Sequence, residues 1–301
     1  MNIRSSLYIV LASLVLGVRS YAVVNVVTTD PTLAWITGEV GGVRVHVESL
    51  SRGVDDPHQV EPRPSMVVKL AHAQVFARIG MDLDIWANGP LTKSGNAQIQ
   101  PGGKGYADCS DNLKRMEIPP AKLDPSMGDI HIYGNPHYLL DPANGILAAG
   151  NIAAALIRVD PAGYSSYHDN FITFGNKVKE KLKSWHATLA PYKGSPVTTY
   201  HRSWVYFMAR FGLKEFGTIE PRPGIPPSPG HIKTLAEGMK ADNVHAMLVE
   251  DFRSHRFPDL LAGQTGAKVV YVPLSVEGEP GIDNYFQLFD TIVNRLAVGL
   301  K

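Results

Sequence analysis

The sequence predicts an α/β protein with two doubly wound, parallel-sheet lobes bridged by one long helix. Three observations support this fold class: strand-like and helix-like segments alternate along the chain, the alternation occurs in each half, and one long amphipathic stretch separates the halves. Parallel strands need crossover connections, which helices usually provide, so the alternation favours parallel sheets over antiparallel ones.

The composition is that of an ordinary globular protein and limits the function classes. The chain has 301 residues, of which 44% are hydrophobic and 19% charged. Lys and Arg number 29 against 28 Asp and Glu, a net charge of +1, so we expect no nucleic-acid partner. The one cysteine, Cys109, excludes a disulfide framework and a cysteine-rich zinc site, which leaves 11 histidines and the carboxylates as candidate metal ligands.

Residues 1–22 have the features of a cleavable signal peptide. Arg4 precedes an uncharged apolar run at 5–18, which is too short to span a bilayer about 30 Å thick, and cleavage is predicted after Ala22. No cysteine follows the run. We therefore expect a protein without a lipid anchor that is exported to a bacterial periplasm.

The N-terminal lobe is predicted to cover residues 23–160. Short β-branched runs predict strands, and apolar residues at helical spacing predict helices. The expected strands are 23–27, 43–47 and 83–86, and the expected helices are 31–36, 64–80 and 146–157. Residues 89–127, rich in Gly, Pro, Lys, Asn and Ser, are expected to form a surface excursion with little core of its own, in which Cys109 is a spare thiol.

A linking helix is predicted at 161–190 and a second α/β lobe at 191–301. Asp160 and Pro161 are good helix-starting residues, and a helix of about 25 residues would be roughly 35–40 Å long, enough to run along both lobes. Its apolar stripe comprises Tyr164, Tyr167, Phe171, Phe174, Val178, Leu182 and Trp185. In the second lobe, strands are expected at 197–200, near 218, at 244–249 and at 267–272. Four helices are expected: one that contains Trp204, one that begins after Pro229, one around Leu260 and one at 283–296.

Three histidines are the candidate metal ligands: His58, His137 and His201. Each is predicted at the carboxyl end of a strand or in the loop beyond it, the edge where open α/β sheets bind ligands. A proline precedes both His58 and His137 and restricts the local backbone. The other eight histidines lack such a context, and we expect no metal role for them: His46, His72, His131, His168, His186, His231, His245 and His255.

The segments around these histidines resemble a known family. Residues 56–65 read DPHQVEPRPS, residues 134–142 read GNPHYLLDP, and residues 201–207 read HRSWVYF, with FGL at 211–213. In this order they are similar to the signature of the zinc/manganese substrate-binding proteins of bacterial ABC importers. The resemblance covers essentially the whole chain after residue 22.

The resemblance implies a monomeric, non-enzymatic carrier with the metal in the cleft between the lobes. It implies that His58, His137 and His201 are ligands, that the cargo is Zn²⁺ with Mn²⁺ less favoured, and that the partner is an ABC permease of the inner membrane. In this family the third position tends to be His in zinc binders and Glu in manganese binders. Imidazole ligands suit Zn²⁺ better than Mn²⁺ on chemical grounds as well.

Two features depart from the family pattern. Many relatives supply a carboxylate after the last strand, but residues 271–275 read YVPLS. Water is therefore the first candidate for the fourth ligand, with Asp283, Glu250 and Glu61 as alternatives. The second departure is that residues 89–127 contain no histidine, so we expect no auxiliary metal site there.

Nearby carboxylates are expected to balance the charge of the metal, and two other functions remain open. The candidates for charge balance are Asp56, Glu61, Asp141 and Glu250. A three-histidine site with an open position would also suit a zinc hydrolase, with Glu61 or Glu250 as general base, although no HExxH or nucleophile-elbow motif is present. A surface adhesin is the third hypothesis for the function, but an adhesin would need an anchor to the cell surface.

Overall fold

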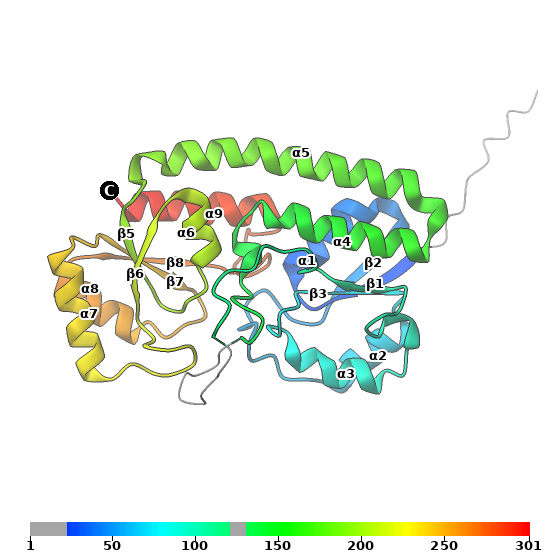
Figure 1. The fold of residues 1–301 in the computed structure, drawn as a ribbon, viewed down its shortest axis with the longest axis horizontal. Helices are drawn as coiled ribbons and strands as arrows, with labels where there is room; N and C mark the ends of the chain where they lie inside the picture. Colours follow the sequence, from blue (N-terminus) through cyan, green and yellow to red (C-terminus); the bar gives the residue numbers. More distant parts are fainter. Residues whose placement is uncertain (1–22, 121–130) are drawn as a thin grey trace, which may run out of the picture.

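The computed structural model describes residues 23–120 and 131–301, and it contains two lobes, each built on a parallel four-stranded sheet (Figure 1). The first sheet has the order β2-β1-β3-β4 and the second β6-β5-β7-β8. Both orders place the first strand of the lobe inside the sheet, as a doubly wound topology does. The predicted fold class is confirmed. The predicted signal peptide and its cleavage site lie outside the described residues.

The first lobe contains the first four strands and four of the helices within the described residues. The strands are β1 (Val24–Thr28), β2 (Val45–Ser49), β3 (Val75–Arg78) and β4 (Tyr106–Asp108), and the helices are α1 (Pro31–Gly41), α2 (Pro64–His72), α3 (Asn88–Lys93) and α4 (Asn144–Val159). Asp30 caps α1, since its side chain accepts hydrogen bonds from the backbone N–H groups of Thr32 and Leu33. This cap fixes the start of α1, which follows the end of β1 after two residues.

The second lobe repeats this arrangement. Its strands are β5 (Pro196–Thr199), β6 (Lys214–Thr218), β7 (Ala246–Glu250) and β8 (Lys268–Val272), and its helices are α6 (Val205–Phe211), α7 (Pro229–Ala241), α8 (Arg256–Thr265) and α9 (Tyr285–Gly299). All five residues of β7 are buried, as expected for a central strand covered on both faces.

The long helix α5 (Tyr164–Leu189) has 26 residues and runs along both lobes (Figure 1). Tyr167, Phe174, Val178 and Trp185 of the predicted stripe are buried, whereas Tyr164 is exposed. The helix packs against α1 and α4 of the first lobe and α9 of the second. One hydrophobic cluster, which includes Val24 and Val197, continues from one lobe into the other.

Two local expectations in the first lobe are wrong. The predicted helix 64–80 ends at His72, and the chain continues as strand β3, whose four residues are all buried. The apolar residues at 76 and 79 fit helical spacing equally well, because a short apolar run does not distinguish a buried strand from a helix. The predicted strand 83–86 is a turn followed by a short 3₁₀ helix (Ile85–Ala87).

The expectation for residues 89–127 is also wrong in its described part. Residues 89–120 include most of α3 and the edge strand β4, and their side chains Leu91, Ile99 and Cys109 are buried. Burial raises the pKa of the Cys109 thiol well above its usual value, so this residue is part of the core and an unreactive thiol. The polar composition of the segment predicted a surface location, because it gave no sign that these few apolar side chains are buried.

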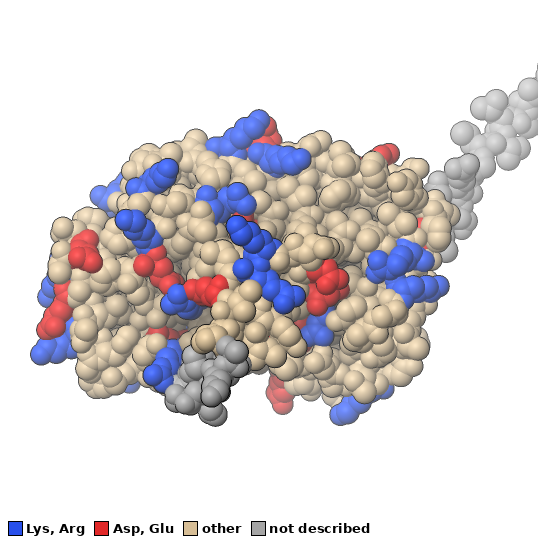
Figure 2. All heavy atoms as spheres, viewed as in Figure 1, with Lys and Arg blue, Asp and Glu red and all other residues tan. Residues whose placement is uncertain are grey.

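Within residues 23–120 and 131–301, no helix combines the length and hydrophobicity needed to cross a bilayer. On the face shown in Figure 2, Lys and Arg are interspersed with Asp and Glu over both lobes. This mixing agrees with the near-zero net charge of the sequence.

Candidate metal centre

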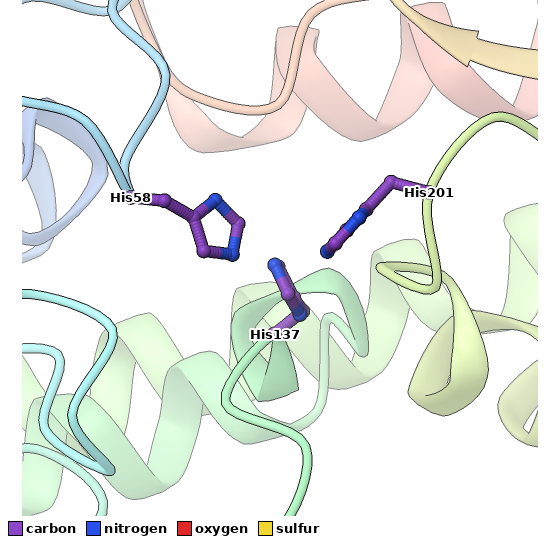
Figure 3. A group of neighbouring side chains, drawn as sticks. All are labelled: His58, His137 and His201. Carbon is purple, nitrogen blue, oxygen red and sulfur yellow. The ribbon is translucent and has the colours of Figure 1, made fainter. Parts of the chain in front are cut away.

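The structure brings His58, His137 and His201 together between the lobes. His58 lies in the loop after β2, His137 precedes a 3₁₀ turn (Tyr138–Leu140) before α4, and His201 follows β5. Their candidate ligand atoms all lie within 4.8 Å of one another. In Figure 3 the three rings, carried by three separate loops, point toward a common centre.

The spacing of the three rings matches the geometry of a small tetrahedral ion. The ring centroids are 5.1 Å apart for His58 and His137, 5.1 Å for His58 and His201, and 5.3 Å for His137 and His201. Zinc–nitrogen bonds of about 2.0–2.1 Å place imidazole centroids about 5.2 Å apart around a tetrahedral metal. The loops therefore hold the rings near the positions that zinc coordination requires.

Each ring is oriented by an oxygen at its Nδ1 atom. His58 Nδ1 lies 2.8 Å from Asp56 Oδ1, His137 Nδ1 lies 3.0 Å from Asn135 Oδ1, and His201 Nδ1 lies 2.7 Å from Glu220 Oε2. An oxygen acceptor at Nδ1 favours the tautomer whose Nε2 lone pair is free for a metal. Within the described residues, Nε2 of His58 and of His137 is buried without a hydrogen-bond partner.

His137 and His201 are held in the neutral form that metals bind. Burial, with a contribution from the nearby His58, lowers the pKa of His137 well below its usual value. Burial also lowers the pKa of His201, although its hydrogen bond to Glu220 acts in the opposite direction. Neutral imidazoles are ready to coordinate without first losing a proton.

Two carboxylates and one arginine surround the rings. Burial opposes ionisation of Asp56, but its hydrogen bond to His58 and the positive charge of Arg253 outweigh this and lower its pKa to about 2. The pKa of Glu220 is also lowered, because contacts with His201 and Arg253 outweigh its burial. Arg253 Nη1 lies 3.4 Å from both Asp56 Oδ2 and Glu220 Oε1. Arg253 thus connects carboxylates from the two lobes.

The structure separates the carboxylates considered for the fourth ligand from the histidine group. Glu61 and Asp283 are exposed. Glu250 is buried, and its Oε1 accepts hydrogen bonds from Ser203 and Trp204. In the part of the chain that the structure describes, no carboxylate or cysteine joins the three histidines in a ligand cluster.

Of the expected charge-balancing carboxylates, Asp56 contacts a candidate ligand, whereas Asp141 does not. Asp141 instead forms an ion pair with Arg210, 2.7 Å away. Glu220 was not anticipated from the sequence. Its signal is its position two residues after the end of β6, the strand paired with β5, because neighbouring parallel strands end at the same sheet edge.

The sequence predicts no metal role for His131, but the structure places this residue beside His58 and His137. Its ring centroid lies 5.4 Å from that of His58 and 6.1 Å from that of His137. Its Nδ1 lies 2.5 Å from Asp82 Oδ1. Asp82 is in the turn after β3, at a backbone φ of 59°. Because His131 and Asp82 are 49 positions apart in the sequence, no local motif could indicate their contact.

Replacing Glu220 with glutamine is expected to weaken zinc binding by ~10–100-fold, the usual effect of changing a residue that orients a metal-bound histidine. The amide keeps the shape but loses the negative charge facing His201. Competition titration with a zinc chelator measures the change. Glu180→Gln on the exposed face of α5 is the control, and equal affinities of the two variants would contradict the role of Glu220.

Zinc affinity is expected to stay nearly constant from pH 8 to about 6.5 and to fall below that range. Burial lowers the pKa of His137 and of His201, so these rings remain neutral at a pH where an ordinary histidine, with a pKa of about 6.5, begins to bind protons. At these two rings, protons compete with the metal only at lower pH. Titrations in pH-matched chelator buffers test this, and a decline that begins above pH 7 would contradict it.

Comparisons with known proteins reveal similar chains over nearly the full length. A family model described as zinc-uptake complex component A, periplasmic, matches residues 26–299. The metal ABC transporter substrate-binding lipoprotein SloC of Streptococcus mutans is 27% identical over 283 residues, which cover 92% of this chain and 90% of the relative. The manganese ABC transporter substrate-binding lipoprotein PsaA of Streptococcus pneumoniae is 26% identical over 284 residues, with coverages of 92% and 89%.

A solved structure shares the fold. The crystal structure of ZnuA superposes with a TM-score of 0.78 at 21% sequence identity and covers 93% of this chain and 100% of that one. The two-lobed architecture is therefore common to both chains.

The relatives correct the expectation about localisation. We expected a periplasmic protein without a lipid anchor, but SloC and PsaA are both named lipoproteins, so this expectation is wrong. It rested only on the missing cysteine after the apolar run, in a segment that lies outside the described residues.

Proposed function

Since this chain belongs to the family of zinc-uptake component A, whose members are substrate-binding proteins of metal ABC importers, we propose that it captures Zn²⁺ with His58, His137 and His201. The resemblance of the sequence motifs to this family is thereby confirmed. Proteins of this class deliver a metal ion to a membrane permease and are not enzymes. The comparisons give no support to a zinc hydrolase.

The choice of zinc rests on the ligand type, because all three candidate ligands are imidazoles. Named relatives include a manganese carrier, so family membership alone does not identify the metal. Mn²⁺ prefers oxygen ligands, whereas imidazole nitrogen suits Zn²⁺. The described residues contribute three buried or half-buried histidines to the cluster and no carboxylate, which favours zinc.

Capture is expected to couple the two lobes through charge as well as through ligation. Three neutral imidazoles leave the +2 charge of the ion uncompensated. The ionised Asp56 and Glu220, which hydrogen-bond His58 and His201, supply negative charge just behind the ligands. Because His58 belongs to the first lobe and His201 to the second, the loaded form links loops from both sides of the cleft.

Metal titration of the metal-free protein tests the proposal. We expect one Zn²⁺ per chain and tighter binding of Zn²⁺ than of Mn²⁺ in chelator competition. His168→Ala, an exposed histidine of α5 outside the cluster, is the control and should bind zinc as the wild type does. A protein that binds no zinc, or that prefers manganese, would refute the proposal.

A further inference from the structure

We propose that His131 is a fourth ligand, so that the bound ion is held by four imidazoles. This inference rests on the proposed function, since it concerns the same ion. It assigns a protein side chain to the coordination position for which water, Asp283, Glu250 and Glu61 are the candidates from the sequence.

The first support is that His131 repeats the arrangement of the other three histidines. Its Nδ1 is hydrogen-bonded to a side-chain oxygen, that of Asp82, as the other rings are to Asp56, Asn135 and Glu220. Its Nε2 is buried and has no hydrogen-bond partner among the described residues. A buried polar nitrogen without a hydrogen-bond partner destabilises the folded state unless a ligand binds it. The neighbouring imidazoles form a metal site, so a metal ion is the ligand that we expect at this nitrogen.

The second support is distance. The centroid of His131 lies 5.4 Å from that of His58, close to the spacing of about 5.2 Å expected around tetrahedral zinc. Its separation from His137 is 6.1 Å, which is somewhat longer. The ring therefore lies beside His58 and His137 but outside the group of three ligand atoms, and coordination requires it to move toward them.

The third support is that His131 lines the same pocket as two of the candidate ligands. Together with His137 and His201 it lines a pocket whose wall also includes Glu117 and Arg202. A ligand on this wall can meet an incoming ion and then close the coordination shell over it. Among the described residues, no carboxylate belongs to the group of candidate ligand atoms.

Four imidazoles would strengthen the preference for zinc. Replacing a water or carboxylate oxygen by nitrogen makes the donor set softer and less suited to Mn²⁺. Charge balance would then come from the carboxylates behind the rings, including Asp82 behind His131 as well as Asp56 and Glu220. The specificity of the carrier would thus depend on a histidine that the family motif does not include.

The experiment compares His131→Ala with the wild type and with the control His168→Ala. We expect His131→Ala to weaken zinc binding by ~100-fold, which equals the largest effect usual for a residue that only orients a ligand. The variant should weaken manganese binding less. Asp82→Asn, which keeps the ring, should weaken zinc binding by ~10-fold. Substitution of Co²⁺ for zinc provides an independent measurement, because loss of a nitrogen ligand changes its visible absorption bands.

The outcomes separate this inference from the proposed function. If the wild type binds no zinc, the proposed function itself fails. If the wild type binds zinc and His131→Ala matches His168→Ala in affinity and in Co²⁺ spectrum, only the fourth ligand is refuted. A weaker affinity with an unchanged Co²⁺ spectrum would also refute ligation, because His131 would then act by positioning its neighbours.

Discussion

Replacing His137 with alanine is expected to weaken zinc binding by ~100-fold or more, beyond the effect of changing an orienting residue. The ring is buried, is neutral because burial lowers its pKa, and lies within 5.3 Å of the rings of both His58 and His201. Its removal therefore takes away one of the three ligands that surround the common centre. Chelator competition measures the affinity.

Thermal unfolding provides a second measurement of the same change. Zinc at 100 times its dissociation constant should stabilise the wild type by about 2.7 kcal/mol, and the same concentration should stabilise His137→Ala very little. The exposed-site variant His168→Ala should retain the full stabilisation. If His137→Ala unfolds like the wild type and binds zinc within tenfold of it, the assignment of His137 as a ligand is wrong.

Replacing Trp204 with alanine is expected to lower the free energy of unfolding by about 3–5 kcal/mol, the usual cost of truncating a buried aromatic side chain. Trp204 is fully buried, and its ring lies 5.6 Å from that of Phe207. Its Nε1 donates a 3.0 Å hydrogen bond to Glu250, whose pKa burial raises to about 7. The substitution would leave a cavity and take one of the hydrogen bonds from this carboxyl.

Urea unfolding of the metal-free protein at neutral pH measures the effect. Trp204→Phe is the matched variant, because it keeps an aromatic ring and most of the volume but loses the hydrogen bond, at a cost of about 1–3 kcal/mol. A loss below about 1 kcal/mol for Trp204→Ala would show that the site collapses around the missing ring.

The fold class was predictable because each lobe repeats a local pattern. The stripe of α5, with Tyr167, Phe174 and Trp185 buried, follows directly from helical spacing. The segment 64–80 was not predictable in detail, since Phe76 fits a helical pattern but lies in the buried strand β3. Neighbouring strands decide such cases, and they are distant in sequence.

The site was predictable to the extent that it depends on strand ends. His58, His137 and His201 were selected because they follow strands or lie in the loops beyond, and the structure brings them together. His131 and Glu220 were missed. Their contacts with Asp82 and His201 join residues 49 and 19 positions apart, and such contacts depend on how turns place side chains in space.

The continuous hydrophobic cluster limits how the molecule can signal that it is loaded. A wide clamshell swing would have to separate apolar side chains that now pack from Val24 through Val197, along a helix shared by both lobes. Uncovering even ~400 Å² of such surface would cost about 10 kcal/mol. Filled and empty carriers should therefore have almost the same outline, and a permease must distinguish them by small rearrangements of the loops at the rim.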